Sequence, residues 1–209
     1  MPLIQTVPPA IEPVAVVDAK SYSRIIDNSE DTLTALLISA ARKYAEAYTG
    51  RSFITQSWKL TLDSFPGRMT QLGVRYGVPY SLPGNAVQLD FGTVQSVDLI
   101  SYTAMDGTTQ TMPATNYIAD LSGCPARVTP VFGQIWPITL PQIASANIAY
   151  TAGYGLTAVS VPEGIRQWIL LRVSTLLENR EAVAIVVRGK VQELPYIDSL
   201  LDPFRVVLA

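Results

Sequence analysis

The stretch DNSEDTLTALLISAARKYAEAYTGR, residues 27–51, carries the clearest helix signal in the sequence. Its apolar side chains recur at steps of three and four residues, a spacing that places them on one face of a helix. This face comprises Leu33, Leu36, Leu37, Ala40, Ala41, Tyr44 and Tyr48. The other face comprises Thr34, Ser39, Arg42, Lys43 and Glu46. We therefore expect the first set to be buried and the second to be solvated.

Both ends of this helix carry recognisable signals. Asp27, Asn28 and Ser29 can each accept a hydrogen bond from the first free backbone amides, so any of them is a competent N-cap. Gly50 stands where a left-handed residue would end the helix.

A second amphipathic helix is expected near the C-terminus. Ser160 and Glu163 have the spacing of a capping box, and Pro162 suits the first turn of a helix. The apolar face of this helix comprises Ile165, Trp168, Ile169, Val173, Leu176 and Leu177. A short final helix is predicted over Pro195–Leu201, ended by Pro203.

The region between the two helices has the alternating pattern of strands. Strands are predicted over residues 54–62, 86–91, 94–104, 108–112, 116–120, 126–129 and 147–151. Asp106-Gly107 predicts a two-residue type I′ hairpin. Gly67–Asn85, with four glycines and two prolines, predicts a long loop.

These elements predict an α+β fold. Two long helices and a short C-terminal helix would form an antiparallel helical bundle, with a small antiparallel β-module inserted between them. Residues 1–26 would be an N-terminal arm and lead-in, residues 27–51 and 160–202 the bundle, residues 52–159 the β-module and residues 203–209 a C-terminal tail. The tail contains FRVVLA, which is unusually apolar for a free end.

Composition narrows the class of protein. Of the 209 residues, 48% are hydrophobic and 15% charged, which supports a substantial core. The net charge of -2 gives no basic surface of the kind that groove-reading proteins carry. The N-terminus has four prolines in its first 13 residues and no basic region, so it does not resemble a signal peptide. No apolar run is long enough for a membrane span, and the sequence predicts a soluble protein.

The residues offer little chemistry. The sequence has no histidine and one cysteine, Cys124, which removes the commonest general base and any cysteine cluster for a metal. No nucleophile, phosphate-loop or calcium-loop motif is present. We therefore predict no catalytic residue, no metal and no cofactor. A hydrolase that uses paired carboxylates stays open as a minor alternative, because the chain has 17 acidic residues.

Five short stretches point to a family. They are EPVAVVDAK at Glu12–Lys20, AEAYTGRSFITQSW at Ala45–Trp58, the VQSV strand with its DG turn at Val94–Gly107, AGYG at Ala152–Gly155 with Val161-Pro162, and ENREAV at Glu178–Val183. In this order and spacing, the chain resembles the head–tail connector, or adaptor, proteins of long-tailed bacteriophages and gene transfer agents. The resemblance extends from about residue 12 to the end. The loop Gly67–Asn85 is longer than the family pattern, which suggests a contact specific to this particle.

The resemblance implies a structural virion protein of the neck that assembles in the host cytoplasm. Its copies would form a ring, typically a dodecamer, beneath the portal protein and would receive a stopper or tail-completion protein. Genomic DNA would pass through the ring without being read. In related adaptors the C-terminal segment docks on the portal, which here corresponds to Phe204, Arg205, Val206, Val207 and Leu208.

In such a ring, charged side chains of the two helices become candidates for contact with the next subunit. They are Arg42, Lys43, Glu46, Arg172 and Arg180. A second function stays open at this point: the aromatic residues of the β-module would suit a carbohydrate- or host-surface-binding protein of a virion.

Overall fold

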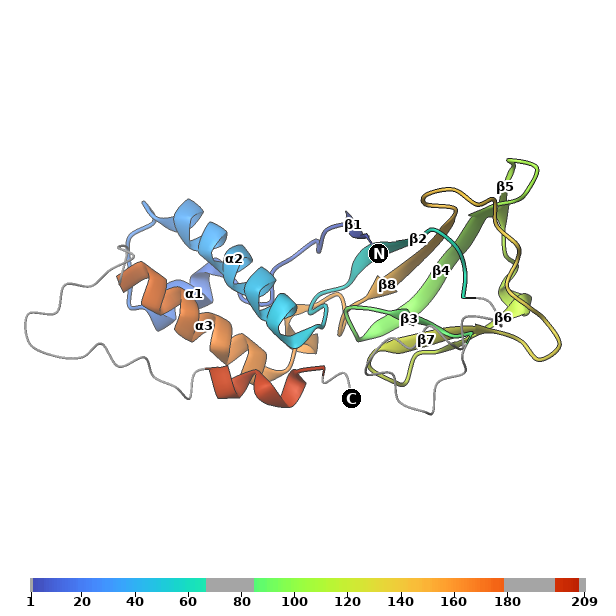
Figure 1. Cartoon of the computed structure of the whole chain (residues 1–209). Coiled ribbons are helices and arrows are strands. Elements are labelled where there is room, and N and C mark those ends of the chain that lie inside the picture. The colour runs from blue at the N-terminus through green and yellow to red at the C-terminus, as the bar shows by residue number, and fades with distance from the viewer. Residues whose placement is uncertain (1, 67–84, 179–197, 207–209) are drawn as a thin grey trace, which may run out of the picture. The chain divides into compact units, whose positions relative to one another are not determined.

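The computed structural model describes residues 2–66, 85–178 and 198–206, which form two compact units (Figure 1). The helical unit is drawn from Ala10–Ile54 and Tyr154–Arg205. The β unit is drawn from residues 2–9 and Thr55–Gly153, with Val206. The chain therefore contributes to the β unit three times, with its N-terminal strand, with residues that follow the long helix, and with Val206.

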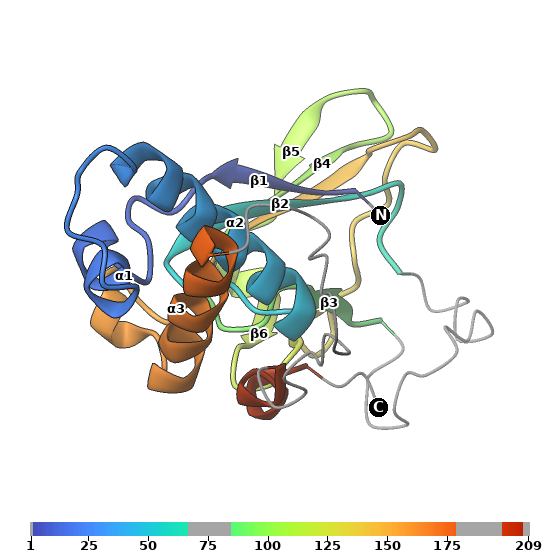
Figure 2. The ribbon, with the colours of Figure 1, turned by 90° about the vertical axis from the view of Figure 1, so that its left-hand side faces the viewer.

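The helical unit contains α1 (Val16–Tyr22), α2 (Asp31–Thr49) and α3 (Glu163–Glu178). Each helix contacts the other two, as Figure 2 shows for α2 and α3 in particular. Their buried side chains form one core of Val14, Ala19, Ile38, Ala41, Ala45, Phe53, Ile54, Val161, Ile165, Trp168, Ile169, Val173, Leu177 and Leu201. Gly50 has φ +66° and ends α2, as its position in the sequence predicts.

The start of α2 differs from the prediction. The helix begins at Asp31, and the preceding residue, Glu30, makes no side-chain cap. Asp27 accepts hydrogen bonds from the amide and hydroxyl of Ser29, and Asn28 accepts one from Lys20. The expected capping residues are therefore engaged in a turn and in a contact with α1, because short polar side chains bond equally well to nearby groups outside a helix.

The buried face of α2 is also not the predicted one. Thr34, Ile38, Ala41, Arg42, Ala45, Glu46 and Thr49 are buried. Of the predicted apolar face, only Ala41 is fully buried, while Leu36 and Tyr44 are 65% and 52% exposed. The prediction failed because it assumed that charged side chains point outward. Here Arg42 and Glu46 neutralise each other inside the unit, which makes their burial tolerable.

The β unit contains eight strands in the described residues. They are β1 (Leu3–Val7), β2 (Gln56–Leu62), β3 (Val87–Leu89), β4 (Val94–Thr103), β5 (Thr109–Thr111), β6 (Tyr117–Asp120), β7 (Ala126–Pro130) and β8 (Ala146–Ala152). One sheet has the order β1-β2-β8-β4-β5 and the other β3-β7-β6, with antiparallel pairing throughout. Strand β8 alternates strictly between buried and half-buried residues, as expected for a strand at the centre of a sheet with one face on the core.

The hairpin between β4 and β5 closes differently from the predicted type I′ turn. The amide of Gly107 donates to the carbonyl of Ala104, so Met105 and Asp106 are the central residues of the turn. Of these turn residues only Gly107 has a positive φ, +83°. This is a type I turn followed by a left-handed glycine, the usual arrangement of a three-residue hairpin loop.

The predicted fold class is wrong. The chain is not a helical bundle of two long helices and a short C-terminal helix with a small insert, because 29% of the described residues are in strand against 32% in helix, and the strands form two antiparallel sheets. The third helix of the described residues is α1, and the C-terminal segment forms two 3-10 turns, Asp198–Leu200 and Asp202–Phe204. Helical periodicity located the long helices but could not reveal that the β unit builds a core of its own. Among the described residues, this core has 15 buried apolar residues and that of the helical unit has 14.

Candidate assembly surfaces

The C-terminal segment is held on the helical unit by polar and aromatic contacts. The guanidinium of Arg51 donates from Nε to the carbonyl oxygen of Phe204 at 2.6 Å. Arg205 lies over the ring of Tyr48, 5.3 Å from its centre, and the Tyr48 hydroxyl donates to Asp202 at 2.8 Å. Two of the predicted portal-docking residues, Phe204 and Arg205, therefore have partners at the end of α2 within their own chain.

Of the three remaining predicted docking residues, only one belongs to the described part of the chain. Val206 is half-buried, and Val207 and Leu208 lie outside the described residues. Phe204 is half-buried against α3 at Gly164, where a Cβ would come within 3.2 Å of the phenyl ring. Gly164 therefore provides the space that lets the C-terminal segment approach α3.

The charged residues predicted at a subunit interface fall into two groups. Arg42 and Glu46 are buried within the helical unit, whereas Lys43 and Arg172 are exposed. Arg180 lies outside the described residues. The predicted set therefore mixes side chains that can reach a neighbour with side chains that stabilise the unit from inside.

Arg42 is the centre of a buried ionic network. Its Nε donates to Glu12 and its second guanidinium nitrogen to Glu46, each at 2.7 Å. The other carboxylate oxygen of Glu46 accepts the backbone amide of Phe53 at 2.9 Å. Burial opposes the charged form of Arg42, but hydrogen bonds to Glu12 and the charge of Glu46 outweigh it and raise its pKa above the ordinary value. The network joins α2 to the segments before and after it.

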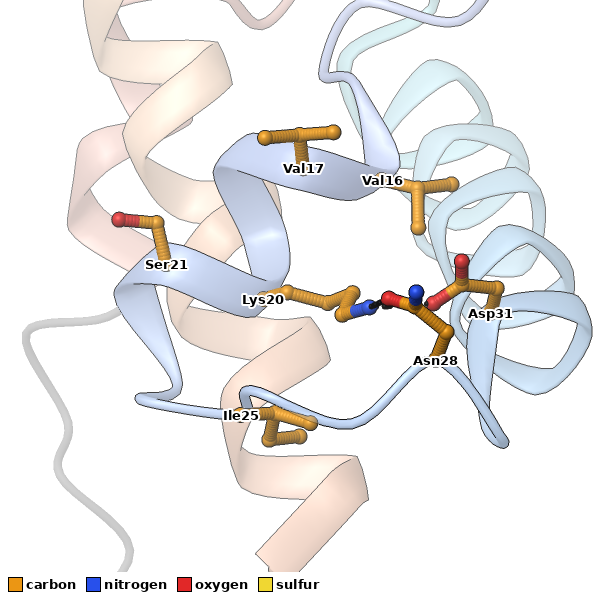
Figure 3. A pocket seen from close by; sticks show the side chains of 7 residues that line it. All are labelled: Val16, Val17, Lys20, Ser21, Ile25, Asn28 and Asp31. Atoms are coloured by element: carbon orange, nitrogen blue, oxygen red, sulfur yellow. Dashed lines mark hydrogen bonds and ion pairs between the residues drawn. The ribbon is translucent and has the colours of Figure 1, made fainter.

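A hollow of about 350 Å³ lies between α1 and the start of α2 (Figure 3). Lys20 extends across it, and its ammonium lies 2.5 Å from the Asn28 oxygen and 2.6 Å from an Asp31 oxygen. Val16 and Ile25 are among the apolar side chains that complete the wall. Because the lysine already has two oxygen partners, this hollow has the chemistry of a structural contact and not that of a reactive amine.

A second hollow of the helical unit is more apolar. It has a volume of about 450 Å³ and lies between the segment before α1 and the middle of α2. Its lining residues are Ile11, Glu12, Val14, Ala15, Val16, Asp18, Ala35, Ile38 and Ala158. In the described ranges, no group of three or more His, Cys, Asp or Glu side chains could hold a metal. Nor do those ranges contain a helix long and apolar enough to cross a membrane.

One exposed apolar segment, residues 131–145 between β7 and β8, was not predicted from the sequence. Phe132 is fully exposed, and Ile135, Ile138 and Ile143 expose between 67% and 87% of their surface. A signal was present in the sequence: no charged residue occurs between Arg127 and Glu163. Surface loops normally carry charge, so an uncharged run of this length containing large apolar side chains indicates a covered surface.

Comparison with known proteins gives a structural likeness and no sequence family. No protein-family model matches the chain, and a search of curated proteins also finds no match. Among solved structures, a chain from the neck of an empty GTA particle computed with C6 symmetry superposes with a TM-score of 0.73 at 19% identity. The alignment covers 99% of this chain and 96% of that chain.

Two further structures agree. A chain from the virion of a native gene transfer agent (GTA) particle superposes with a TM-score of 0.76 at 17% identity, and one from the neck of the native particle computed with C12 symmetry with 0.64 at 18%. Both alignments again cover 99% of this chain and 96% of the other. The fold is shared with chains of GTA particles. Because the shared region is nearly the whole of each chain, the likeness includes both units.

Proposed function

We propose that this chain is a structural, non-enzymatic protein of the neck of a phage-like particle. One observation carries the proposal: its whole fold matches chains of structures described as GTA necks, at TM-scores of 0.73 and 0.64. Those necks were computed with sixfold and twelvefold symmetry, which supports a ring of identical subunits. The sequence motifs that resemble head–tail adaptors support the same function independently of the superposition.

The finer proposal is a head–tail adaptor. Twelve copies form a ring beneath the portal protein, extend the channel for genomic DNA and receive a stopper or tail-completion protein on the other side. The ring assembles in the host cytoplasm and remains in the virion neck. DNA passes without sequence reading, and the net charge of -2 suits this role because a strongly basic channel would retain phosphates.

We assign separate tasks to the parts of the chain. Residues 27–51 and 160–202 form the ring body, residues 52–159 form an inserted β-module, and residues 203–209 dock on the portal. Lys43 and Arg172 are exposed and contact the next subunit directly. Arg42 and Glu46 are buried and hold α2 in position for that contact.

The test uses particles made by cells in which the gene has been deleted and replaced by a tagged copy. We expect deletion to give DNA-filled or empty heads without tails, and the tagged copy to restore tailed particles with the tag at the neck by immunogold microscopy. Tailed particles formed without the gene, or a tag at the tail tip, would contradict the adaptor proposal. The second result would instead favour a host-surface-binding protein.

The docking role has its own test. Truncation after Val206 removes only the last three residues and leaves every described contact of Phe204 and Arg205 in place. We expect this truncated protein to remain folded by circular dichroism but to be lost from the neck. Alanine substitution of exposed Leu156 is the matched control and should leave incorporation unchanged. Normal incorporation of the truncated protein would show that the last residues are not needed for docking.

A further inference from the structure

The segment 131–145 of the β unit holds exposed apolar side chains on a backbone that is fixed at several points. Trp136 anchors this segment. Its indole is buried, stacks on the ring of Phe65 with 4.5 Å between the ring centroids, and donates a hydrogen bond to the Asn85 carbonyl at 2.6 Å. The amide of Leu140 donates to the carbonyl of Thr103 at the end of β4, at 2.9 Å. The loop backbone is therefore fixed to the β unit, and its exposed side chains have fixed positions.

The end of the segment is fixed as well. The buried hydroxyl of Ser145 lies 2.6 Å from the Leu140 carbonyl oxygen and 2.9 Å from that of Gln142. The Ala144 amide donates to the carboxylate of Asp63, which follows β2. These contacts tie the loop to both neighbouring strand ends.

Phe132 stands at the tip of a tight turn. The amide of Gln134 donates to the carbonyl of Val131, and Gly133 has φ +82°, which together define a type II turn. This turn holds the phenyl ring away from the unit, where it is fully exposed. A large aromatic side chain fixed in this way is typical of the anchor residues that fill a pocket on a partner.

The edge strand β1 offers a second unprotected apolar surface on the same unit. Ile4 and Val7 are 54% and 55% exposed, and no charged residue precedes Glu12 in the sequence. On its outer side β1 has no strand neighbour among the described residues. Free edge strands are normally protected by charged side chains, because they otherwise pair with other chains. The absence of such charges indicates that this edge is covered in the assembled protein.

The two surfaces are different faces of the β unit. Strand β1 is one edge of the five-stranded sheet, whereas the segment 131–145 is fixed at Thr103, the end of β4, and at Asp63, which follows β2 (Figure 1). A closed ring requires this arrangement, since each copy contacts its neighbours through two different, complementary faces. An anionic membrane or a nucleic acid would need cations at the loop, and none occurs between Arg127 and Glu163.

We propose that the loop 131–145 of one copy packs on the β1 edge of the next copy. The proposal rests on the function proposed above, and it adds a subunit contact made by the β unit to the one made by the helices. Phe132 and Ile135 lie against the exposed face of β1, Ile4 and Val7, and the apolar residues of both copies become covered.

Disulfide cross-linking tests the pairing in assembled particles. In a Cys124→Ser background, which removes the single cysteine, Ile4→Cys and Phe132→Cys are combined in one chain. Because each copy then carries both halves of the contact, oxidation should give a ladder of dimers, trimers and larger oligomers that disappears with reductant. Each single-cysteine variant should remain monomeric. The pair Ile4→Cys and Leu99→Cys is the matched control, since Leu99 is exposed on β4 outside the loop.

Two results would overturn the proposal: double-cysteine protein that enters particles but gives no ladder, or a cross-link to a protein of different mass. If the wild-type chain is absent from the neck, the adaptor function fails and the subunit contact fails with it. Phe132→Asp provides a second measurement that needs no cross-link. We expect its incorporation per particle to fall on the order of tenfold, as for loss of an interface anchor. Unchanged incorporation would count against the contact.

Discussion

The helical unit and the β unit differ in which of their features can be predicted from the sequence. In the helical unit the elements are easy to locate, but their buried faces are not, because charged side chains lie inside. In the β unit, strands such as β7 and β8 follow simple alternation, but the exposed apolar side chains of residues 131–145 lie in a loop without periodicity. Polarity patterns therefore locate elements better than they identify surfaces.

The difference has a physical basis. Arg42, Glu46 and Glu12 satisfy one another, so the helical unit depends on buried electrostatics. The β unit is held chiefly by apolar packing around β8, where Ile148, Tyr150 and Ala152 are fully buried. A substitution in the ionic network should therefore destabilise the helical unit, and one in the apolar core around β8 should destabilise the β unit. Tryptophan fluorescence can follow the unfolding of each unit separately, because Trp168 lies in the helical core and Trp58 and Trp136 lie in the β unit.

The largest effect is expected from Glu46→Ala. It leaves the buried guanidinium of Arg42 with one partner and the Phe53 amide without its acceptor. Removing one member of a buried ion pair costs about 3–5 kcal/mol of unfolding free energy. Urea denaturation followed by Trp168 fluorescence, with the other two tryptophans replaced by phenylalanine, measures it.

The matched control is Lys43→Ala, an exposed charge one residue from Arg42, for which we expect a change within about 0.5 kcal/mol. Equal effects of the two variants would show that the buried network does not stabilise the helical unit. A second protein that keeps Trp136 as its single tryptophan reports on the β unit in the same way. If Glu46→Ala shifts the unfolding midpoints of both proteins equally, the two units unfold as one.

A smaller loss of stability, this time in the β unit, is expected from Tyr150→Phe. The hydroxyl of Tyr150 donates to the Asp90 carbonyl at 2.8 Å, and loss of this buried hydrogen bond costs about 1–2 kcal/mol. Burial, and secondarily the charge of Asp90, raises the pKa of Tyr150 well above 10. The folded β unit therefore favours the neutral phenol, and stability is lost as the pH rises above about 10, where the unfolded chain ionises.

The phenylalanine variant lacks this ionisation. The stability difference from wild type should therefore narrow above pH 10, as measured by urea denaturation at pH 8 to 11. A difference that stays constant over this range would show that Tyr150 does not carry the alkaline sensitivity of the β unit.

The same substitution, glycine to alanine at a left-handed position, can be made in each unit and its effect on stability compared. Gly50 ends α2 with φ +66°, and Gly107 closes the β4–β5 hairpin with φ +83°. A side chain in this conformation costs about 1 kcal/mol, so Gly50→Ala and Gly107→Ala should lower stability by similar amounts, each in its own unit. No atom lies within 4 Å of a Cβ built at Gly107, so its cost is that of the backbone alone. A much larger loss at Gly107 would contradict this interpretation.

Some features of the fold could be predicted from the sequence and others could not. Seven of the eight strands in the described residues were predicted, because alternation such as that of β8 marks a face on the core. Strand β1 was not predicted, since residues 1–26 were expected to form an arm and lead-in. The ionic network could not be predicted, since Glu12 and Arg42 are 30 residues apart and their contact depends on tertiary packing. The exposed loop could have been found from its missing charges, but nothing in the sequence reveals that Trp136 anchors it to Phe65. Long-range contacts are what local patterns omit.

The smallest effect concerns a half-buried ion pair between β6 and β7 of the second sheet. Asp120 bonds to Arg127 and accepts hydrogen bonds from Ser122, and these contacts, those from Ser122 first, lower its pKa from 3.8 to about 2. A carboxylate with a lowered pKa contributes stability above its unfolded value of 3.8, and this stability is lost as the pH falls toward 2. In Asp120→Asn, the decline of β-unit stability between pH 4 and 2 should therefore be shallower.

Asp106→Asn is the matched control for this comparison. Asp106 lies in a similar turn and accepts hydrogen bonds from the amide and hydroxyl of Thr108, which lower its pKa, and no cation is among the causes of that shift. Each aspartate contributes to the loss of stability between pH 4 and 2. Salt should reduce the contribution of Asp120 more than that of Asp106, because screening acts on the Arg127 charge and hardly on short hydrogen bonds. Thermal melts at pH 2 to 4, with and without sodium chloride at about 0.1 M, measure this difference, because salt at that concentration reduces the screening length to about 10 Å. Equal salt responses of the two variants would show that the ion pair adds nothing to the turn.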